Sequence, residues 1–195
     1  MKKTNEKLKK WDRSTVAKTV SYFAVHTAII MLLFVLALAL SADFDMAFAW
    51  EKFAGTGVAG RIVYLIIAVC LVSVGIFLYF WFEDRDFLHD GKNVNMLFVI
   101  IEVSILMLYV VGKWRSIYAR PFALCALLVL MVSDRRKAVF TNCVVCLLVF
   151  ISDAFVSIDM TDNRALYASL VIGFVAGTMA IYLVDGQSAR FKVLL

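Results

Sequence analysis

The chain has 195 residues, of which 63% are hydrophobic, and its mean hydropathy is +0.88. Such a composition leaves too little polar surface to cover a water-soluble globule, so a soluble fold is excluded. The formal net charge is +5, and almost all charged residues fall in the short gaps between apolar stretches, which predicts a membrane protein and gives no reason to expect a nucleic-acid partner.

Six apolar stretches follow one another, each long enough or nearly long enough for a transmembrane helix of roughly 20 residues. They are Thr19–Ser41, Ile62–Phe82, Val94–Gly112, Ile117–Val132, Ala138–Ile158 and Ala165–Val184, the fourth being short. Lipid offers no partners for free backbone N–H and C=O groups, so each stretch should be helical. We predict an all-α, polytopic bundle of six transmembrane helices over residues 19–184, preceded by a basic tail at 1–18 and followed by a cytoplasmic segment at 185–195.

Lys and Arg collect on one side of this predicted bundle. The tail, Arg85, Lys92, the Arg135–Lys137 cluster, Arg190 and Lys192 lie on that side, while Lys52, Arg61, Lys113, Arg115, Arg120 and Arg164 lie on the other. The positive-inside rule therefore predicts a multi-pass membrane protein with both termini in the cytoplasm. The apolar run of the first span is too long for a cleaved signal peptide, so we expect a retained anchor.

Two ionisable residues fall well inside predicted spans. Glu102 lies near the middle of the third span, where an ionised carboxylate costs on the order of 2.5–3.5 kcal/mol and needs a partner. His26 lies seven residues into the first span, and both helices run outward, so the two residues sit at similar depth. A His26–Glu102 pair is allowed, either as a proton or ligand site or as a hydrogen bond between helices.

Asp153 lies in the outer third of the fifth span. We interpret it as a hydrated residue at the membrane edge, with the alternative that it lines an outer cavity together with Tyr109 and Trp114. In the last span, Gly173 and Gly177 have the small-xxx-small spacing that lets helix backbones approach closely. Packing inside the bundle is the default interpretation of these glycines, and a dimer contact is the alternative.

Cysteine and histidine patterns give no catalytic or metal centre. Cys143 and Cys146 have zinc or redox spacing, but they lie in an apolar span with no second ligand pair, so we expect packing residues and no metal or cofactor. His89 and Asp90 copy the doublet of metal-dependent phosphohydrolases, but such a centre needs further His and Asp ligands. The remaining histidine, His26, lies inside a span.

The second half of the chain carries a family resemblance. The segment from Tyr118 through Pro121 to Asp134 and Ala138, followed by Asn142, resembles a hairpin of the bacterial seven-transmembrane HD family, and the Gly173/Gly177 helix with its exit Asp185–Arg190 is similar to the family's next segment. These proteins are membrane phosphohydrolases that degrade cyclic di-AMP. In the family an extracellular domain separates the first two spans, where this chain has only Ala42–Arg61, and a last span and the HD domain would follow its end.

The resemblance implies a truncated or naturally reduced sensor or anchor portion in the bacterial cytoplasmic (inner) membrane, to which none of the family's catalytic ligands can be transferred. Two functions stay open at this stage. One is a non-catalytic module that relays a signal through the lipid bilayer to a cytoplasmic protein partner or domain, either alone or as a homodimer. The other is the substrate-binding membrane subunit of a vitamin-type transporter, which would show a polar, aromatic cavity opening outward.

Overall fold

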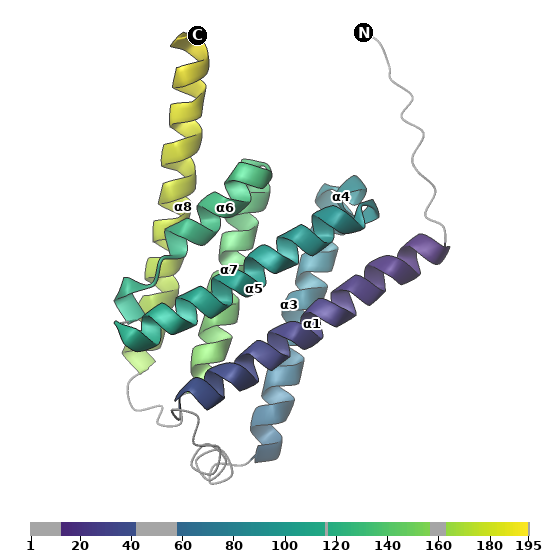
Figure 1. The fold of residues 1–195 in the computed structure, drawn as a ribbon, viewed down its shortest axis with the longest axis vertical. Helices are drawn as coiled ribbons and strands as arrows, with labels where there is room; N and C mark the ends of the chain where they lie inside the picture. Colours follow the sequence, from purple (N-terminus) through teal and green to yellow (C-terminus); the bar gives the residue numbers. More distant parts are fainter. Residues whose placement is uncertain (1–12, 42–57, 116, 157–162, 195) are drawn as a thin grey trace.

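The structure is a computed structural model that describes residues 13–41, 58–115, 117–156 and 163–194 (Figure 1). The described residues are helical and include no strand, which confirms the predicted all-α membrane bundle. The basic tail up to residue 12, most of the connection at 42–57 and Thr161 lie outside the described residues.

Five described helices are long and apolar enough to cross a membrane: α1 (Arg13–Ser41), α3 (Val58–Glu83), α5 (Gly91–Trp114), α7 (Arg135–Val156) and α8 (Asn163–Leu194). Their outward faces carry large apolar side chains. Leu32 on α1, Leu71 on α3 and Leu183 on α8 are 67%, 66% and 63% exposed, respectively. Water would penalise so much apolar surface, and lipid accommodates it.

The fourth predicted span is not one helix. A short 3-10 turn, η1 (Ile117–Ala119), precedes Pro121, and the α-helix α6 (Phe122–Val132) begins only after it. Proline has no N–H to donate and restricts the residue before it, so a helix continuous from residue 117 is disfavoured. At 1.5 Å per residue, α6 is about 16.5 Å long, roughly half of a 30 Å hydrocarbon core.

A five-residue helix, α4 (Arg85–His89), joins α3 to α5 and was not predicted. Asp84 caps it, because its side chain accepts a hydrogen bond from the Phe87 backbone N–H at 3.1 Å. Asp90 then caps α5 by accepting from the Lys92 N–H at 3.0 Å. In the doublet His89-Asp90, His89 is therefore the last residue of α4 and Asp90 is the N-cap of α5. Both residues have a local structural role.

Helix α7 occupies the centre of the bundle and packs against α1, α3, α5, α6 and α8. Its inward face includes the buried residues Val145, Leu148 and Asn142. Helix α8 packs on α6 and α7 through Gly173 and Gly177: a Cβ on Gly173 would lie 2.7 Å from the Phe122 ring, and one on Gly177 would meet the Asn142 side chain. The structure therefore places both glycines in packing contacts within the bundle.

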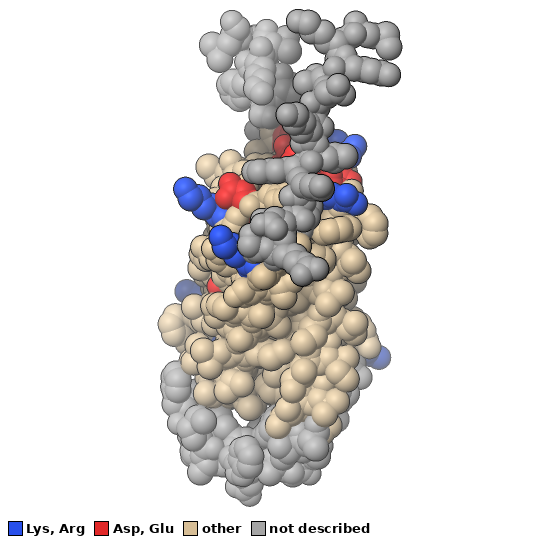
Figure 2. Space-filling view, turned by 90° about the vertical axis from the view of Figure 1, so that its right-hand side faces the viewer, with Lys and Arg blue, Asp and Glu red and all other residues tan. Residues whose placement is uncertain are grey.

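Charged side chains collect at one end of the bundle. Figure 2 shows blue and red side chains in the upper part of the molecule, above a broad region that is mostly uncharged. The beginning of α1, the end of α3, α4, the α6–α7 turn and the end of α8 all lie at the upper end in Figure 1. The beginning of α1 and the end of α8 therefore lie toward the same end of the bundle (Figure 1).

Candidate functional site

The structure brings His26 and Glu102 into contact where α1 crosses α5. Nδ1 of His26 lies 2.8 Å from Oε1 of Glu102, and Nε2 on the other side of the ring lies 3.1 Å from Oδ1 of Asn95. The His26 side chain is buried, and the Glu102 side chain is only 12% exposed. Each nitrogen of this imidazole therefore has one specific oxygen partner on α5.

Aromatic residues hold the His26 ring in place. The Phe98 ring stacks on it, with centroids 4.7 Å apart and an interplanar angle of 4°. Phe23, one turn earlier on α1, contacts the same Phe98 ring edge to face at 5.0 Å. Because the imidazole plane is fixed between neighbours, its two nitrogens point consistently at Glu102 and Asn95.

A second polar cluster lies toward the opposite end of the bundle. Arg120, just before Pro121, makes a two-pronged ion pair with Asp153 on α7: Nη2 donates to Oδ1 at 2.8 Å and Nη1 donates to Oδ2 at 2.5 Å. Nη1 also lies 3.2 Å from the Ser169 hydroxyl on α8. Both charged side chains are buried, so this pair ties the irregular segment before α6 to two helices.

The interpretation of Asp153 as a hydrated edge residue is wrong, because the residue is only 7% exposed and its carboxylate is paired with Arg120. In the alternative interpretation, Asp153 shares an outer cavity with Tyr109 and Trp114, but the structure places these three side chains in different environments. Trp114 is 80% exposed at the end of α5, and the Tyr109 hydroxyl donates to the Ala37 carbonyl of α1 at 2.8 Å. Tyr109 thus joins α5 to α1, while Asp153 joins α7 to the α6 segment.

Arg120 is the functional-site candidate that the sequence analysis missed. It was counted as a loop charge on the outer side, yet its side chain is among the most buried charged groups of the described residues. A signal was present in the sequence, because an acidic residue inside a span, Asp153, requires a cation within reach. Removing Arg120 from the outer loop charges widens the Lys/Arg difference between the two sides.

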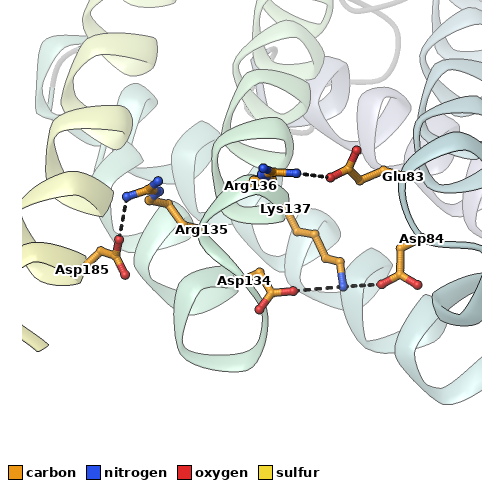
Figure 3. Close-up of a pocket in the computed structure, with 7 residues that line it drawn as sticks. All are labelled: Glu83, Asp84, Asp134, Arg135, Arg136, Lys137 and Asp185. Carbon is orange, nitrogen blue, oxygen red and sulfur yellow. Dashed lines mark hydrogen bonds and ion pairs between the residues drawn. The ribbon is translucent and has the colours of Figure 1, made fainter. Parts of the chain in front are cut away.

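The charged end of the bundle holds a hydrophilic cavity of about 550 Å³, here called the end-face cavity (Figure 3). Three ion pairs cross it: Arg135 with Asp185 of α8 at 3.0 Å, Arg136 with Glu83 of α3 at 2.9 Å, and Lys137 with Asp84 at 2.6 Å. Asp134 completes the lining and lies 3.4 Å from Lys137. The three consecutive cations that open α7 therefore connect it to both sides of the bundle.

Asp84 belongs to this network and lies in the connection between α3 and α4, outside the membrane-spanning segments. Burial alone would raise the pKa of its carboxyl, but hydrogen bonds from Lys137 and from the Phe87 backbone N–H outweigh burial, so the pKa falls below its ordinary value of 3.8. The carboxylate is therefore ionised throughout the neutral range, and the Asp84–Lys137 contact is an ion pair at physiological pH.

Among the described residues, no three or more His, Cys, Asp or Glu side chains are placed to hold a metal ion. The four cysteines, Cys70, Cys125, Cys143 and Cys146, are free thiols. The polar contacts of these sites are the hydrogen bonds of His26 with Glu102 and Asn95, the ion pair of Arg120 with Asp153, and the ion pairs of the end-face cavity.

Comparison with known protein families identifies a family for most of the chain. A family model described as a 7TM receptor with intracellular HD hydrolase matches residues 59–195, which include all of α3 but its first residue and the whole of α4 to α8. The match confirms the resemblance found in the sequence and covers the membrane part, not the HD hydrolase domain. No curated protein and no solved structure matches the chain.

Proposed function

This chain belongs to the family of 7TM receptors with intracellular HD hydrolase, and we propose that it is a non-catalytic receptor module that relays an event in its bundle to a cytoplasmic partner or domain. The observation that carries the proposal is the family match over residues 59–195. A membrane sensor-type module follows directly from that match. We further propose that the module relays a signal and that this relay is linked to cyclic di-AMP through an HD hydrolase.

Helix α8 is the best candidate for the output element. Its 32 residues are about 48 Å long at 1.5 Å per residue, which exceeds the roughly 30 Å of a hydrocarbon core. It packs on α6 and α7 inside the bundle and continues beyond Asp185, and Figure 1 shows its end projecting past the other helices. A shift of α7 against α8 would therefore move a helix end that reaches outside the membrane.

We propose that the end-face cavity lies on the cytoplasmic side. The Lys and Arg distribution supports this orientation, because Arg85, Lys92 and the Arg135–Lys137 cluster all lie at this end. Ser133, in the α6–α7 turn, reports on it. In a S133C variant in which the four native cysteines are replaced by Ala, an impermeant maleimide should label the protein in inverted membrane vesicles and not in intact spheroplasts. Labelling only from the spheroplast exterior would reverse the orientation.

The relay itself is tested in the bacterium that makes this chain. Removing the chain should change the cellular cyclic di-AMP concentration, measured by mass spectrometry, and a plasmid copy should restore it. A copy with the double substitution R135E/R136E should reach the membrane in the same amount and fail to restore it, because both ion pairs of α7 with α3 and α8 become repulsive.

The matched control is R164E, which reverses an exposed arginine at the other end of α8 and should restore the concentration fully. Unchanged cyclic di-AMP on removal of the chain would contradict the relay to a cyclic di-AMP hydrolase. Hydrolysis of cyclic di-AMP by the purified chain in nanodiscs would contradict the non-catalytic assignment.

The transporter alternative is not favoured by any contact in the described outer half. A solute-binding subunit needs polar and aromatic side chains directed into an open cavity. Asp153 instead neutralises Arg120 in a buried pair, and Trp114 is 80% exposed.

A further inference from the structure

Both nitrogens of the His26 ring face oxygen atoms. Nδ1 lies 2.8 Å from Oε1 of Glu102 and Nε2 lies 3.1 Å from Oδ1 of Asn95. An ionised carboxylate and an amide oxygen only accept hydrogen bonds, whereas a neutral imidazole donates from one nitrogen and accepts at the other. With a neutral ring and an ionised Glu102, one of these two contacts would join two acceptors.

One additional proton satisfies both contacts. It either makes His26 an imidazolium that donates to Glu102 and Asn95, or it resides on Glu102, whose O–H then donates to Nδ1 while Nε2–H donates to Asn95. The two arrangements contain the same number of protons and have the same total charge of zero. We propose that His26, Glu102 and Asn95 form a proton-binding site inside the membrane-spanning bundle, which takes up one proton as a unit.

Burial favours the loaded form of this site. The loaded unit is neutral overall, whereas release of the proton leaves an uncompensated carboxylate on a helix that crosses the membrane, which is costly. The Phe98 ring, stacked on His26 at 4.7 Å, presents the negative face of its π system to the imidazole and stabilises positive charge there.

The neighbouring helices supply no fixed charge at this level. Between Ile62 and Phe82 on α3, and between Ala138 and Ser152 on α7, the sequence has no Asp, Glu, Lys, Arg or His. Within these two stretches the ionisable side chains are Tyr64, Cys70 and Tyr79 on α3 and Cys143 and Cys146 on α7; of the other packed elements, α6 has Cys125, η1 has Tyr118, and α4 has Arg85, Asp86 and His89. The charged groups of α3 and α7 lie outside the two stretches: Arg61 and Glu83 on α3, and Arg135, Arg136, Lys137 and Asp153 on α7. On α5 itself, Lys92 lies in the first turn and is exposed. Glu102 is therefore the only carboxylate of the described residues in contact with His26.

Asn95 gives the site a connection to the end of the bundle. It lies about one turn after the start of α5 at Gly91 and is exposed, although its partner His26 is buried. At the same end, the Thr19 hydroxyl of α1 donates to the Leu88 carbonyl at 3.2 Å. A proton arriving from the charged end of the bundle thus meets Asn95 before it meets His26.

Release of the proton must rearrange the contact between α1 and α5. In the observed geometry Oδ1 of Asn95 faces the ring, so loss of the proton leaves two acceptors opposite each other and the contact of Nε2 with Asn95 opens. The loaded state keeps both hydrogen bonds in the observed geometry, so it is the state in which α1 is held more firmly against α5. Proton binding at this site does not depend on whether the module signals.

The first test is the thermal stability of the full chain in nanodiscs as a function of pH. In the wild type, Tm should fall by roughly 2–4 °C as pH rises through one step between about pH 5 and 8, the change for one lost hydrogen bond in a chain of this size. The step should be absent in E102Q, which is nearly isosteric. It should persist in H89Q, which removes the only other histidine. A step that persists in E102Q or disappears in H89Q would overturn the proposal.

The second test does not require E102Q to fold. In H89Q, His26 is the sole imidazole, so nitrogen NMR of ¹⁵N-histidine protein reports on this ring alone. In one step, the ring should change from two protonated or proton-sharing nitrogens at low pH to one protonated and one lone-pair nitrogen at high pH. Ring signals that stay constant from about pH 5 to 8 would show that no proton is exchanged and would overturn the proposal.

Discussion

Replacing Arg120 by Met is expected to lower the free energy of unfolding by about 3–5 kcal/mol, because it leaves the buried Asp153 carboxylate without its partner. The double variant R120M/D153L should recover most of this loss, since a buried ion pair can often be exchanged for apolar residues of similar size at little cost. Unfolding by SDS titration in mixed micelles, followed by helical circular dichroism, measures both values.

R115M is the matched control for R120M. Arg115 lies five positions earlier and is exposed, so its replacement should change stability by no more than about 0.5 kcal/mol. If R120M were as mild as R115M, Asp153 would have another compensating contact and the pair would not be the anchor of the α6 segment. If the double variant were less stable than R120M, the charges themselves would be required at this position.

The substitution G177A is expected to destabilise the packing of α8 on α7 by about 1–3 kcal/mol, the usual cost of overfilling a packed site. A Cβ at this position would lie 2.5 Å from both Cγ and Nδ2 of Asn142, well inside van der Waals contact. Asn142 has little room to move, because it is buried and its Nδ2 lies 3.3 Å from the Phe174 carbonyl of α8. The same SDS titration measures the loss.

The control is G75A on α3, where a Cβ meets nothing within 4 Å. Alanine favours a helix interior over glycine by up to about 1 kcal/mol, so G75A should be neutral or stabilising. In addition, N142A should relieve most of the effect of G177A, because it removes the atoms that the new methyl group meets. Equal effects of G177A and G75A would show that α8 is not closely packed on α7.

The transmembrane helices could be predicted from the sequence because lipid imposes both length and apolar character on every crossing. The prediction failed where a local backbone rule applied within an apolar stretch: Pro121 separates η1 from α6, although hydropathy continues across it. Helix α4 was missed because a five-residue helix has no periodic pattern and is defined mainly by its cap, Asp84.

The two intramembrane polar clusters show what can and cannot be predicted from the depth of a residue within its predicted span. His26 and Glu102 were paired because both lie at a similar distance from the same membrane edge, and the structure places them 2.8 Å apart. Asp153 was misinterpreted because its partner, Arg120, is 33 positions away and was counted among the charges of the outer side. Depth alone does not show that the interruption of the helix at Pro121 places the Arg120 side chain in the interior of the bundle.

The short α6 also has a consequence for the surrounding lipid. Its outer surface carries Leu124, Leu128 and Met131, all exposed, and Tyr118 marks the end of this apolar strip where η1 begins. Acyl chains beside α6 therefore meet a hydrophobic wall of about 16.5 Å instead of 30 Å, and matching it requires the leaflet there to become thinner. We expect hydrophobic mismatch at this flank to make the protein sensitive to bilayer thickness, with thin membranes favouring the observed arrangement of α6.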